Sequence, residues 1–464
     1  MSAARSDPFQ DTIAAIATPA GEGGIGVVRL SGPQALDVAS RLFSPYSGAD
    51  PREFTSHTMY LGQVVDPGTG SPIDEAYCVL MRPPRSFTGE ETVELHGHGG
   101  RVPLQAILSA AVRHGARPAM PGEFTRRAFL NGRIDLAQAE AVLEIVKART
   151  DAGLRAAMRQ LQGGVSERVR GIRAELLSLL ATLEASVDFP EEGIHFPEIG
   201  ELEKQVDLVM DGLKALIQKA RDGRLLREGA IAVIVGRPNV GKSSLLNVLL
   251  GRERAIVSAV PGTTRDTVEE EFQVGGFPVR LIDTAGLRQA KGDPVETEGL
   301  RRTRIAMGVA DLTLVVLDGS EGITPPDLQA WSEAQGSRIL VLNKSDLPAA
   351  LSPVAYQERF GVEPFFTSAI TGQGVEALRE ELRQRLGGEA DGEALLMLLP
   401  RHRDALERAE KQLLDVRGGL GGGASPEIAS LDVRGALGAL GEIVGETVTE
   451  EMLDQIFQQF CIGK

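Results

Sequence analysis

The segment GRPNVGKS, at residues 236–243, constrains the fold of this chain more than any other. It matches the pattern G-x-x-x-x-G-K-[S/T], follows the strand-like run IAVIV and precedes the helix-like run SLLNVLL. In that context the glycines let the backbone wrap around phosphate groups, while backbone N–H groups and the helix N-terminus attract negative charge. We therefore expect a nucleotide-binding module, with Lys242 on the β- and γ-phosphates and Ser243 on Mg²⁺.

Three later motifs indicate that the nucleotide is GTP: DTAG, NKSD, and Ser368-Ala369, which follows FFT and completes the usual guanine-binding loop. The motif DTAG at 283–286 closes a strand-like run, and it is expected to supply a carboxylate near Mg²⁺ and an amide that senses the γ-phosphate. The motif NKSD at 343–346 follows RILVL, and its carboxylate can accept two hydrogen bonds that only guanine donates. Four elements in this order predict a Ras-like module. Its expected GTP-binding residues are Asn239, Val240, Gly241, Lys242, Ser243, Ser244, Ser258, Ala259, Val260, Pro261, Gly262, Thr263, Thr264, Asp283, Thr284, Ala285, Gly286, Asn343, Lys344, Asp346, Ser368 and Ala369.

The hydrolytic machinery departs from the Ras pattern. Leu287 follows DTAG, where Ras-like enzymes carry a glutamine that orients the attacking water, and a leucine cannot do this. Glu296 is a candidate replacement; the alternative is that it is a solvated loop carboxylate. Thr264 can supply a second Mg²⁺ ligand. The side-chain carbonyl of Asn239 can hold K⁺ against the phosphates, which would supply positive charge in the transition state.

The remaining chain divides by pattern into segments on either side of this module. Its 464 residues suggest about three domains. Residues 1–128 mix short apolar runs with Gly/Pro turns, which is typical of an α+β domain. Residues 129–223 and 388–464 are helical in pattern, and residues 224–387 alternate strands with helices. We therefore expect a multidomain α/β protein, in which a Ras-like P-loop GTPase domain is inserted into a discontinuous α-helical domain.

Two finer expectations concern the C-terminal helical part. Residues 417–427 are glycine-rich and are expected to form a flexible connector that ends in a Ser-Pro-Glu helix start. Residues 428–460 then carry a continuous helical pattern.

Composition narrows the class of protein. Two cysteines, Cys78 and Cys461, exclude a disulfide framework and favour a reducing compartment. The net charge of −15 argues against a broad basic surface for nucleic acid, although it permits a local RNA site. No apolar run approaches the ~18 residues needed to span a bilayer, and the N-terminus lacks a signal-peptide core. We expect a cytoplasmic protein without membrane contact.

Longer motifs resemble one family. GRPNVGKSSLLN, AIVSAVPGTTRD, DTAGLR and the terminal CIGK resemble the MnmE (TrmE) family of tRNA-modifying GTPases, as do ATPAGEGGIGVVRLSG, SFTGEETVELHGHGG and RPAMPGEFTRRAFLNGRIDLAQAEAV. The resemblance implies an N-terminal domain that binds tetrahydrofolate, such as 5-formyltetrahydrofolate, and forms a homodimer. It also implies K⁺-dependent pairing of G domains. With the FAD protein MnmG, such enzymes install aminomethyl or carboxymethylaminomethyl groups at carbon 5 of the wobble uridine of certain tRNAs.

The resemblance also assigns roles to individual residues. Glu296 matches the glutamate that orients water, although the preceding AGLRQAKGDPVE is one residue longer than usual, and Ser243 and Thr264 match the Mg²⁺ ligands. The implied K⁺ ligands are Asn239, Ser258, Val260 and Thr263. The implied folate contacts are Arg29, Glu94, Arg133 and Lys464; Arg133 stands where lysine also occurs, which preserves charge but alters hydrogen-bond geometry.

Several alternatives stay open. Cys461 is either a packed small residue or a functional thiol beside the folate site; a glycine and a terminal lysine argue against prenylation. His96 and His98 suggest a metal pair, but a glycine-rich turn around a ligand explains the segment better. A ribosome-assembly GTPase of the Era or Der type is the competing function, disfavoured because the added domains are not basic. A folate-dependent one-carbon transferase regulated by GTP is a third.

Overall fold

The computed structural model describes residues 11–188, 197–251, 269–283, 308, 310–386, 396–423 and 425–464, without the side chains of 220–222, 269–271 and 283. The chain divides into two compact units. One comprises Met1–Leu143, Leu161–Gln205 and Lys411–Lys464, and the other comprises Glu144–Gln160 and Val206–Glu410. The predicted domain boundaries stay a prediction, because this division follows a different partition of the chain.

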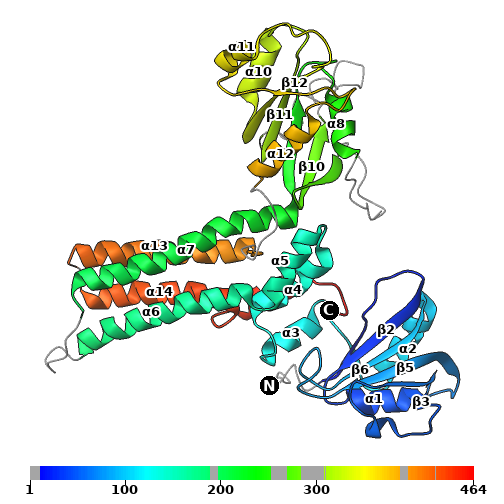
Figure 1. Cartoon of the computed structure of the whole chain (residues 1–464). Coiled ribbons are helices and arrows are strands. Elements are labelled where there is room, and N and C mark those ends of the chain that lie inside the picture. The colour runs from blue at the N-terminus through cyan, green and yellow to red at the C-terminus, as the bar shows by residue number, and fades with distance from the viewer. Residues whose placement is uncertain are drawn as a thin grey trace, which may run out of the picture. The chain divides into compact units, whose positions relative to one another are not determined.

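A seven-stranded sheet forms the N-terminal part of the first unit (Figure 1). Its order is β3-β4-β5-β6-β2-β1-β7. The bounds are β1 Ile13–Ile16, β2 Gly23–Ser31, β3 Phe43–Pro45, β4 Met59–Val65, β5 Pro72–Met81, β6 Thr92–Gly99 and β7 Arg117–Pro118, with a 3₁₀ turn at Pro51–Glu53. This confirms the expected α+β domain, and its strands β1, β2, β5 and β6 overlap the short apolar runs at 12–17, 26–30, 77–81 and 92–95 of the sequence.

Side chains alternate between the two faces of this sheet. Val28 and Leu30 of β2 face a core shared with α1 (Ala35–Leu42) and α2 (Arg101–Arg113). Val27 and Arg29 therefore lie on the opposite face. That second face is available for a binding site.

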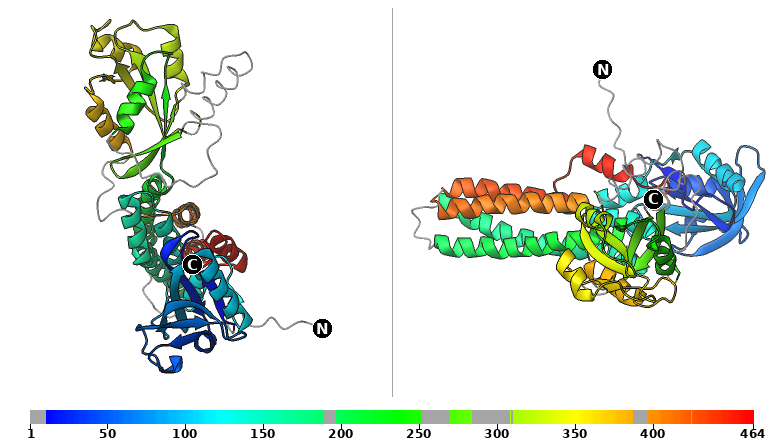
Figure 2. Two further views of the ribbon diagram at one scale, coloured as in Figure 1. Left: turned by 90° about the vertical axis from the view of Figure 1, so that its right-hand side faces the viewer. Right: turned by 90° about the horizontal axis from the view of Figure 1, so that it is seen from above.

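The first unit also contains helices. These are α3 Glu123–Leu130, α6 Gly164–Asp188, α14 Pro426–Val444 and α15 Glu450–Phe457. Helices α6 and α14 lie side by side in both views of Figure 2, and the Arg173 guanidinium on α6 donates to the Leu437 carbonyl on α14 at 2.5 Å. Helices α4 Leu136–Lys147, α7 Ile199–Glu228 and α13 Pro400–Gly421 have residues in both units, as does α5 Asp151–Leu161 through its last residue.

One expectation about the C-terminal helices needs correction, and a second gains detail. Helix α13 extends to Gly421 into the predicted connector, because burial of Leu420 outweighs the low helix propensity of the glycines. The helical pattern over 428–460 corresponds to two helices. Gly445, with φ +92°, ends α14, and the Thr449 hydroxyl accepts a hydrogen bond from the Met452 N–H to begin α15.

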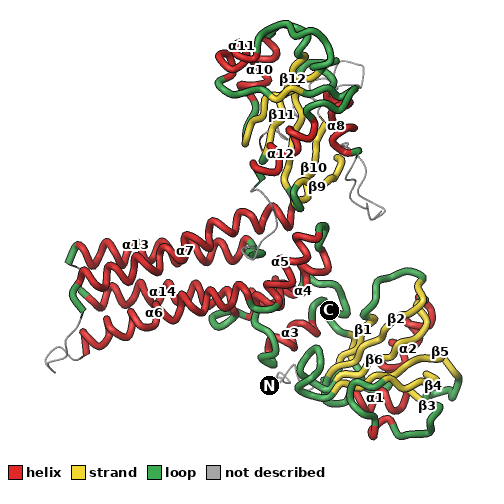
Figure 3. The backbone as a smooth tube through the Cα atoms, viewed as in Figure 1, coloured by secondary structure: helices red, strands yellow, loops and turns green. Residues whose placement is uncertain are grey.

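The second unit contains a six-stranded sheet of order β13-β12-β11-β8-β10-β9 (Figure 3). All adjacent strands run parallel except β9 and β10. The strands are β8 Ala230–Val235, β9 Glu269–Val274, β10 Phe277–Asp283, β11 Leu312–Asp318, β12 Ser337–Asn343 and β13 Phe365–Phe366. The helices are α5 Asp151–Leu161, α8 Lys242–Leu250, α10 Pro325–Glu333, α11 Pro353–Phe360 and α12 Val375–Arg385.

Burial of this sheet on both faces confirms the predicted α/β module. Every residue of β11 is buried, with Leu314 and Val316 in one core and Val315 and Leu317 in the other. Parallel strands covered on both faces need such continuous apolar runs. The carboxyl ends of β8, β11 and β12 then lead into loops at one edge of the sheet, where such folds bind ligands.

Candidate functional sites

The phosphate-binding loop joins β8 to α8, as the motif predicts. Gly241 has φ +93°, and a Cβ there would lie 2.1 Å from Asn343 Nδ2, so a side chain is excluded. Lys242 opens α8 and is 6% exposed, and its Nζ donates to the carbonyls of Gly236 at 3.1 Å and Arg237 at 2.6 Å. Ser243 and Ser244 are exposed on the first turn of α8, beside the loop. The structure therefore brings the residues of the predicted phosphate-binding loop together.

The guanine-recognition motifs contact the phosphate-binding loop. Asn343, at the end of β12, donates from Nδ2 to the Val240 carbonyl at 2.9 Å and accepts from the Ala369 N–H at 3.1 Å. The Ser368 hydroxyl donates to the Asp346 carboxylate at 2.6 Å, which leaves its second oxygen for a ligand. The structure thus brings together three of the four motifs predicted from sequence.

The ion pair between Lys344 and the Asp318 carboxylate was not predicted from the sequence. Lys344 has φ +64°, and its Nζ lies 2.6 Å from Asp318 Oδ2 at the end of β11. Burial raises the pKa of Asp318, but hydrogen bonds from Lys344 and Ser320 outweigh it and hold that pKa below its usual value. One signal for this contact is present in the sequence. Asp318 ends the strand β11, and Asn343 of the NKSD motif ends the neighbouring parallel strand β12.

Part of the predicted GTP site lies outside the described residues. This part comprises Ser258, Ala259, Val260, Pro261, Gly262, Thr263, Thr264, Thr284, Ala285, Gly286 and Glu296. Asp283 is described by its backbone alone, at the end of β10. Of the predicted cation ligands, Asn239 and Ser243 are therefore described; Asn239 is exposed, with φ +66°.

A second cluster lies on the first unit's sheet, on the face opposite α1 and α2. Arg29 of β2 and Glu94 of β6 are cross-strand partners, with Nε 2.7 Å from Oε1. His96 Nε2 lies 2.9 Å from the other Glu94 oxygen. Burial raises the pKa of Glu94, but His96 and Arg29 together hold it below its usual value, so this carboxylate is charged at neutral pH.

Aromatic rings surround the Arg29 guanidinium, whose carbon lies 5.1 Å from the Phe87 ring centre and 5.6 Å from that of Phe124. Arg133 approaches the same Phe87 ring at 5.7 Å and donates to the Phe87 carbonyl. Burial lowers the pKa of Arg133 from its usual value, so an anion placed beside this cation would gain from the reduced solvation. Sequence reasoning missed Phe87, which lies in SFTGE.

The C-terminal tail completes this cluster. Arg29 Nη1 donates to the Gly463 carbonyl at 3.4 Å, and the Gly122 N–H donates to the Cys461 carbonyl at 3.4 Å. Gly463 has φ +94°, and a Cβ there would lie 2.4 Å from the Ile16 carbonyl oxygen. The structure therefore brings Arg29, Glu94 and Arg133 into one cluster and places Lys464 one residue from it.

The two cysteines differ in exposure, and the two candidate histidines have different partners. Cys461 is exposed, whereas burial raises the pKa of Cys78 to about 12. His96 pairs with Glu94, and His98 pairs with Asp74 at 2.7 Å, so the two histidines do not share a ligand. Over the ranges that the structure describes, there is no group of three metal-ligating side chains, and no helix is long and apolar enough to cross a membrane.

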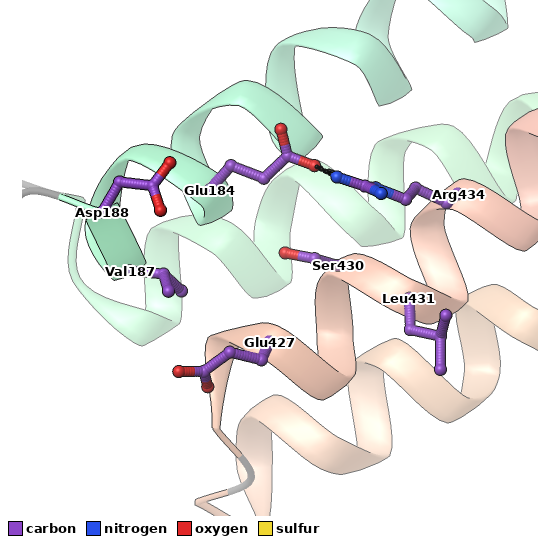
Figure 4. A pocket seen from close by; sticks show the side chains of 7 residues that line it. All are labelled: Glu184, Val187, Asp188, Glu427, Ser430, Leu431 and Arg434. Atoms are coloured by element: carbon purple, nitrogen blue, oxygen red, sulfur yellow. Dashed lines mark hydrogen bonds and ion pairs between the residues drawn. The ribbon is translucent and has the colours of Figure 1, made fainter.

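A groove of about 330 Å³ lies between α6 and α14 (Figure 4). Glu184 and Arg434 form an ion pair of 2.6 Å across it, and its other lining residues are Val187, Asp188, Glu427, Ser430 and Leu431. None of these residues belongs to the predicted sites.

Comparison with known proteins covers nearly the whole chain. A family model described as the MnmE helical domain matches residues 136–461, and one described as the GTP-binding protein TrmE N-terminus matches residues 12–133. The tRNA modification GTPase MnmE of Heliobacterium modesticaldum is 48% identical over 466 residues, which cover 98% of this chain and 99% of that relative. The protein of the same name from Symbiobacterium thermophilum is 47% identical over 458 residues, with 98% and 100% covered.

Among solved structures, the G domain of the Thermotoga maritima FeoB iron transporter is 29% identical, covering 34% of this chain and 98% of that one, with a TM-score of 0.27. The matches to family models and to near full-length relatives, together with the phosphate-binding and guanine-recognition geometry, identify this chain as a GTPase that belongs to the MnmE (TrmE) family of tRNA modification GTPases.

Proposed function

We propose that this GTPase acts on tRNA, installing with MnmG an aminomethyl or carboxymethylaminomethyl group at carbon 5 of the wobble uridine, and that it does so in the cytoplasm. The observation that carries the proposal is the joining, in one chain, of a guanine-nucleotide site and a separate cluster around Arg29. A GTPase alone does not need the second cluster, whereas a one-carbon transfer does.

The Arg29 cluster fits a tetrahydrofolate. A pterin ring presents adjacent N–H donors, and a charged carboxylate such as Glu94 can accept two of them. The glutamate tail of the ligand carries carboxylates, for which Arg133 and Lys464 are the complementary cations. Phe87 supplies an apolar surface beside the cations for the ring system between these two ends.

Two cations belong to the proposed GTP site. Ser243 would hold Mg²⁺ with Thr264, and Asn239 would hold K⁺ with Ser258, Val260 and Thr263. The exposed position of the Asn239 amide on the phosphate-binding loop fits this role. When bound, K⁺ would supply positive charge near the phosphates, and Glu296 would orient the attacking water.

The K⁺ assignment has a direct test. GTP turnover is compared in KCl and NaCl at equal ionic strength, for the unmutated chain and Asn239→Ala. We expect faster turnover in KCl, with most of the difference lost in the variant. Equal rates in both salts would overturn the assignment.

A homodimer through the N-terminal domain is part of the proposal. Met59, Leu61 and Tyr77 are 52%, 41% and 45% exposed on the sheet face that carries Arg29. Leu61 pairs with Tyr77, and Tyr77 pairs with His96, so this apolar row runs directly to the cluster. A contiguous exposed apolar row is typical of an interface. Light scattering should show that Leu61→Asp is monomeric, while Ile370→Asp, at an exposed site of the second unit, stays dimeric.

The proposed tRNA reaction is tested in cells. Bulk tRNA from cells with and without this protein is digested, and its nucleosides are measured by mass spectrometry. We expect loss of the carboxymethylaminomethyl-type uridines. An unchanged profile would contradict the proposal and favour a role in ribosome assembly.

A further inference from the structure

The phosphate-binding loop is held by an ion pair between a half-buried arginine and a buried carboxylate, which the GTP motifs do not include. Arg237, the second residue of the loop, lies with its Nε 2.8 Å from Asp327 Oδ1 on α10. The Asp327 side chain is 1% exposed, and its other oxygen accepts from the Thr324 N–H at 2.9 Å and the Thr324 hydroxyl at 2.7 Å. The hydrogen bonds from Thr324 therefore fix the Asp327 carboxylate independently of Arg237.

Arg237 connects this carboxylate to Lys242. The Arg237 carbonyl accepts from Lys242 Nζ at 2.6 Å, so the side chain and the carbonyl of one residue hold the two partners. A second carboxylate, Glu321, lies 3.1 Å from Arg237 Nη1. The direction of the Arg237 carbonyl, and with it the position of the lysine amine, thus depends on the loop that enters α10.

The same loop reaches the guanine side of the site. It begins at Asp318, which holds Lys344 at 2.6 Å, and ends at Asp327. Tyr356 of α11 is 1% exposed, and its hydroxyl donates to the Glu321 carbonyl at 3.3 Å, which supports the loop from beneath. One acidic segment therefore contacts both the phosphate-binding and the guanine-binding loops.

We propose that the segment 318–327 is a brace for the nucleotide site, in which Asp327 and Arg237 are positioning residues that act through Lys242. The Arg237–Asp327 pair differs from a purely structural ion pair in one respect: breaking it weakens nucleotide binding only when Lys242 is present. Asp318 acts through Lys344, so substitution of Asp318 should weaken binding whether or not Lys242 is present.

A double-mutant cycle on the full chain tests this. The Kd of a fluorescent GDP analogue is measured for Arg237→Met, Lys242→Ala and the double variant, and also for Asp327→Asn. We expect Arg237→Met alone to raise Kd roughly tenfold, the effect of losing a charge-assisted hydrogen bond, and to change Kd less than twofold beside Lys242→Ala. Asp327→Asn should follow Arg237→Met, and Arg237→Lys should recover part of the affinity.

Two matched variants complete the design. Arg383→Met breaks an ion pair with Glu380 on α12 of the same unit and should leave Kd unchanged. Asp318→Asn should raise Kd by the same factor with or without Lys242. The proposal is overturned if Arg237→Met lowers the melting temperature but leaves Kd unchanged, or if its effect on Kd is the same in both Lys242 backgrounds.

Discussion

The nucleotide site and the Arg29 cluster are built in opposite ways. At the nucleotide site, short motifs follow consecutive strands of a parallel sheet, and Asn343 reaches back 103 residues to Val240. The Arg29 cluster joins strands β2 and β6 to the last residues of the chain, and Arg29 reaches 434 residues to Gly463. The first site can form within one folded module, whereas the second requires the N-terminal sheet and the C-terminal tail together.

This difference predicts that the two sites can be disabled independently. A substitution in the phosphate-binding loop should affect guanine nucleotides alone. A substitution at Gly463 in the tail should affect the proposed folate site alone, although Gly463 lies 434 residues from Arg29 in the sequence.

The largest expected effect is that of Lys242→Ala on GTP turnover. The variant removes the amine held by the carbonyls of Gly236 and Arg237, so kcat should fall by ~10²–10³, the range found when one transition-state donor is removed. Steady-state phosphate release measures this. The control is Lys214→Ala on the exposed surface of α7. Retained turnover in Lys242→Ala would contradict the assignment.

A smaller effect is expected for Gly463→Ala on folate binding. The added Cβ would lie 2.4 Å from the Ile16 carbonyl at a φ of +94°, so the tail must move away from Arg29. Strain of this kind costs about 1–3 kcal/mol, and we expect roughly a tenfold loss of 5-formyltetrahydrofolate affinity by calorimetry.

Gly48→Ala is the matched control for that variant. Gly48 also has a left-handed φ, +70°, but a Cβ there meets nothing within 4 Å. It should cost some stability and leave both ligands bound. If Gly48→Ala and Gly463→Ala lower folate affinity equally, the position of the tail does not matter.

The last comparison concerns the two thiols. Exposed Cys461 should react with Ellman's reagent faster than Cys78, because burial raises the Cys78 pKa to about 12 and the thiolate is the reactive form. Bound 5-formyltetrahydrofolate should slow the Cys461 reaction, and GDP should not. Slowing by GDP instead would contradict the separation of the two sites.

Local pattern determined what the sequence could predict. The order of strand, glycine-rich loop and helix predicted the cradle around Lys242, because each part of that site is set by neighbours in the chain. The continuous apolar run of β11 likewise predicted a buried strand of a parallel sheet.

Contacts between distant residues were not predictable in this way. The pairing of Arg237 with Asp327 spans 90 residues and has no motif. The Arg29 cluster was expected only from resemblance to a family, and Phe87 was missed because its role depends on two cations from other segments. The helix break at Gly445 was missed because the apolar period continues through it.

Paired binding titrations test the central claim most directly. The affinities for GDP and for 5-formyltetrahydrofolate are measured on the unmutated chain, Lys242→Ala and Arg29→Met. Arg29→Met removes one of the two partners of Glu94 and the donor to Gly463. We predict that Lys242→Ala binds GDP more weakly and keeps its folate affinity, and that Arg29→Met binds folate more weakly and keeps its GDP affinity. Weaker binding of both ligands in either variant, or folate binding unaffected by Arg29→Met, would contradict the account.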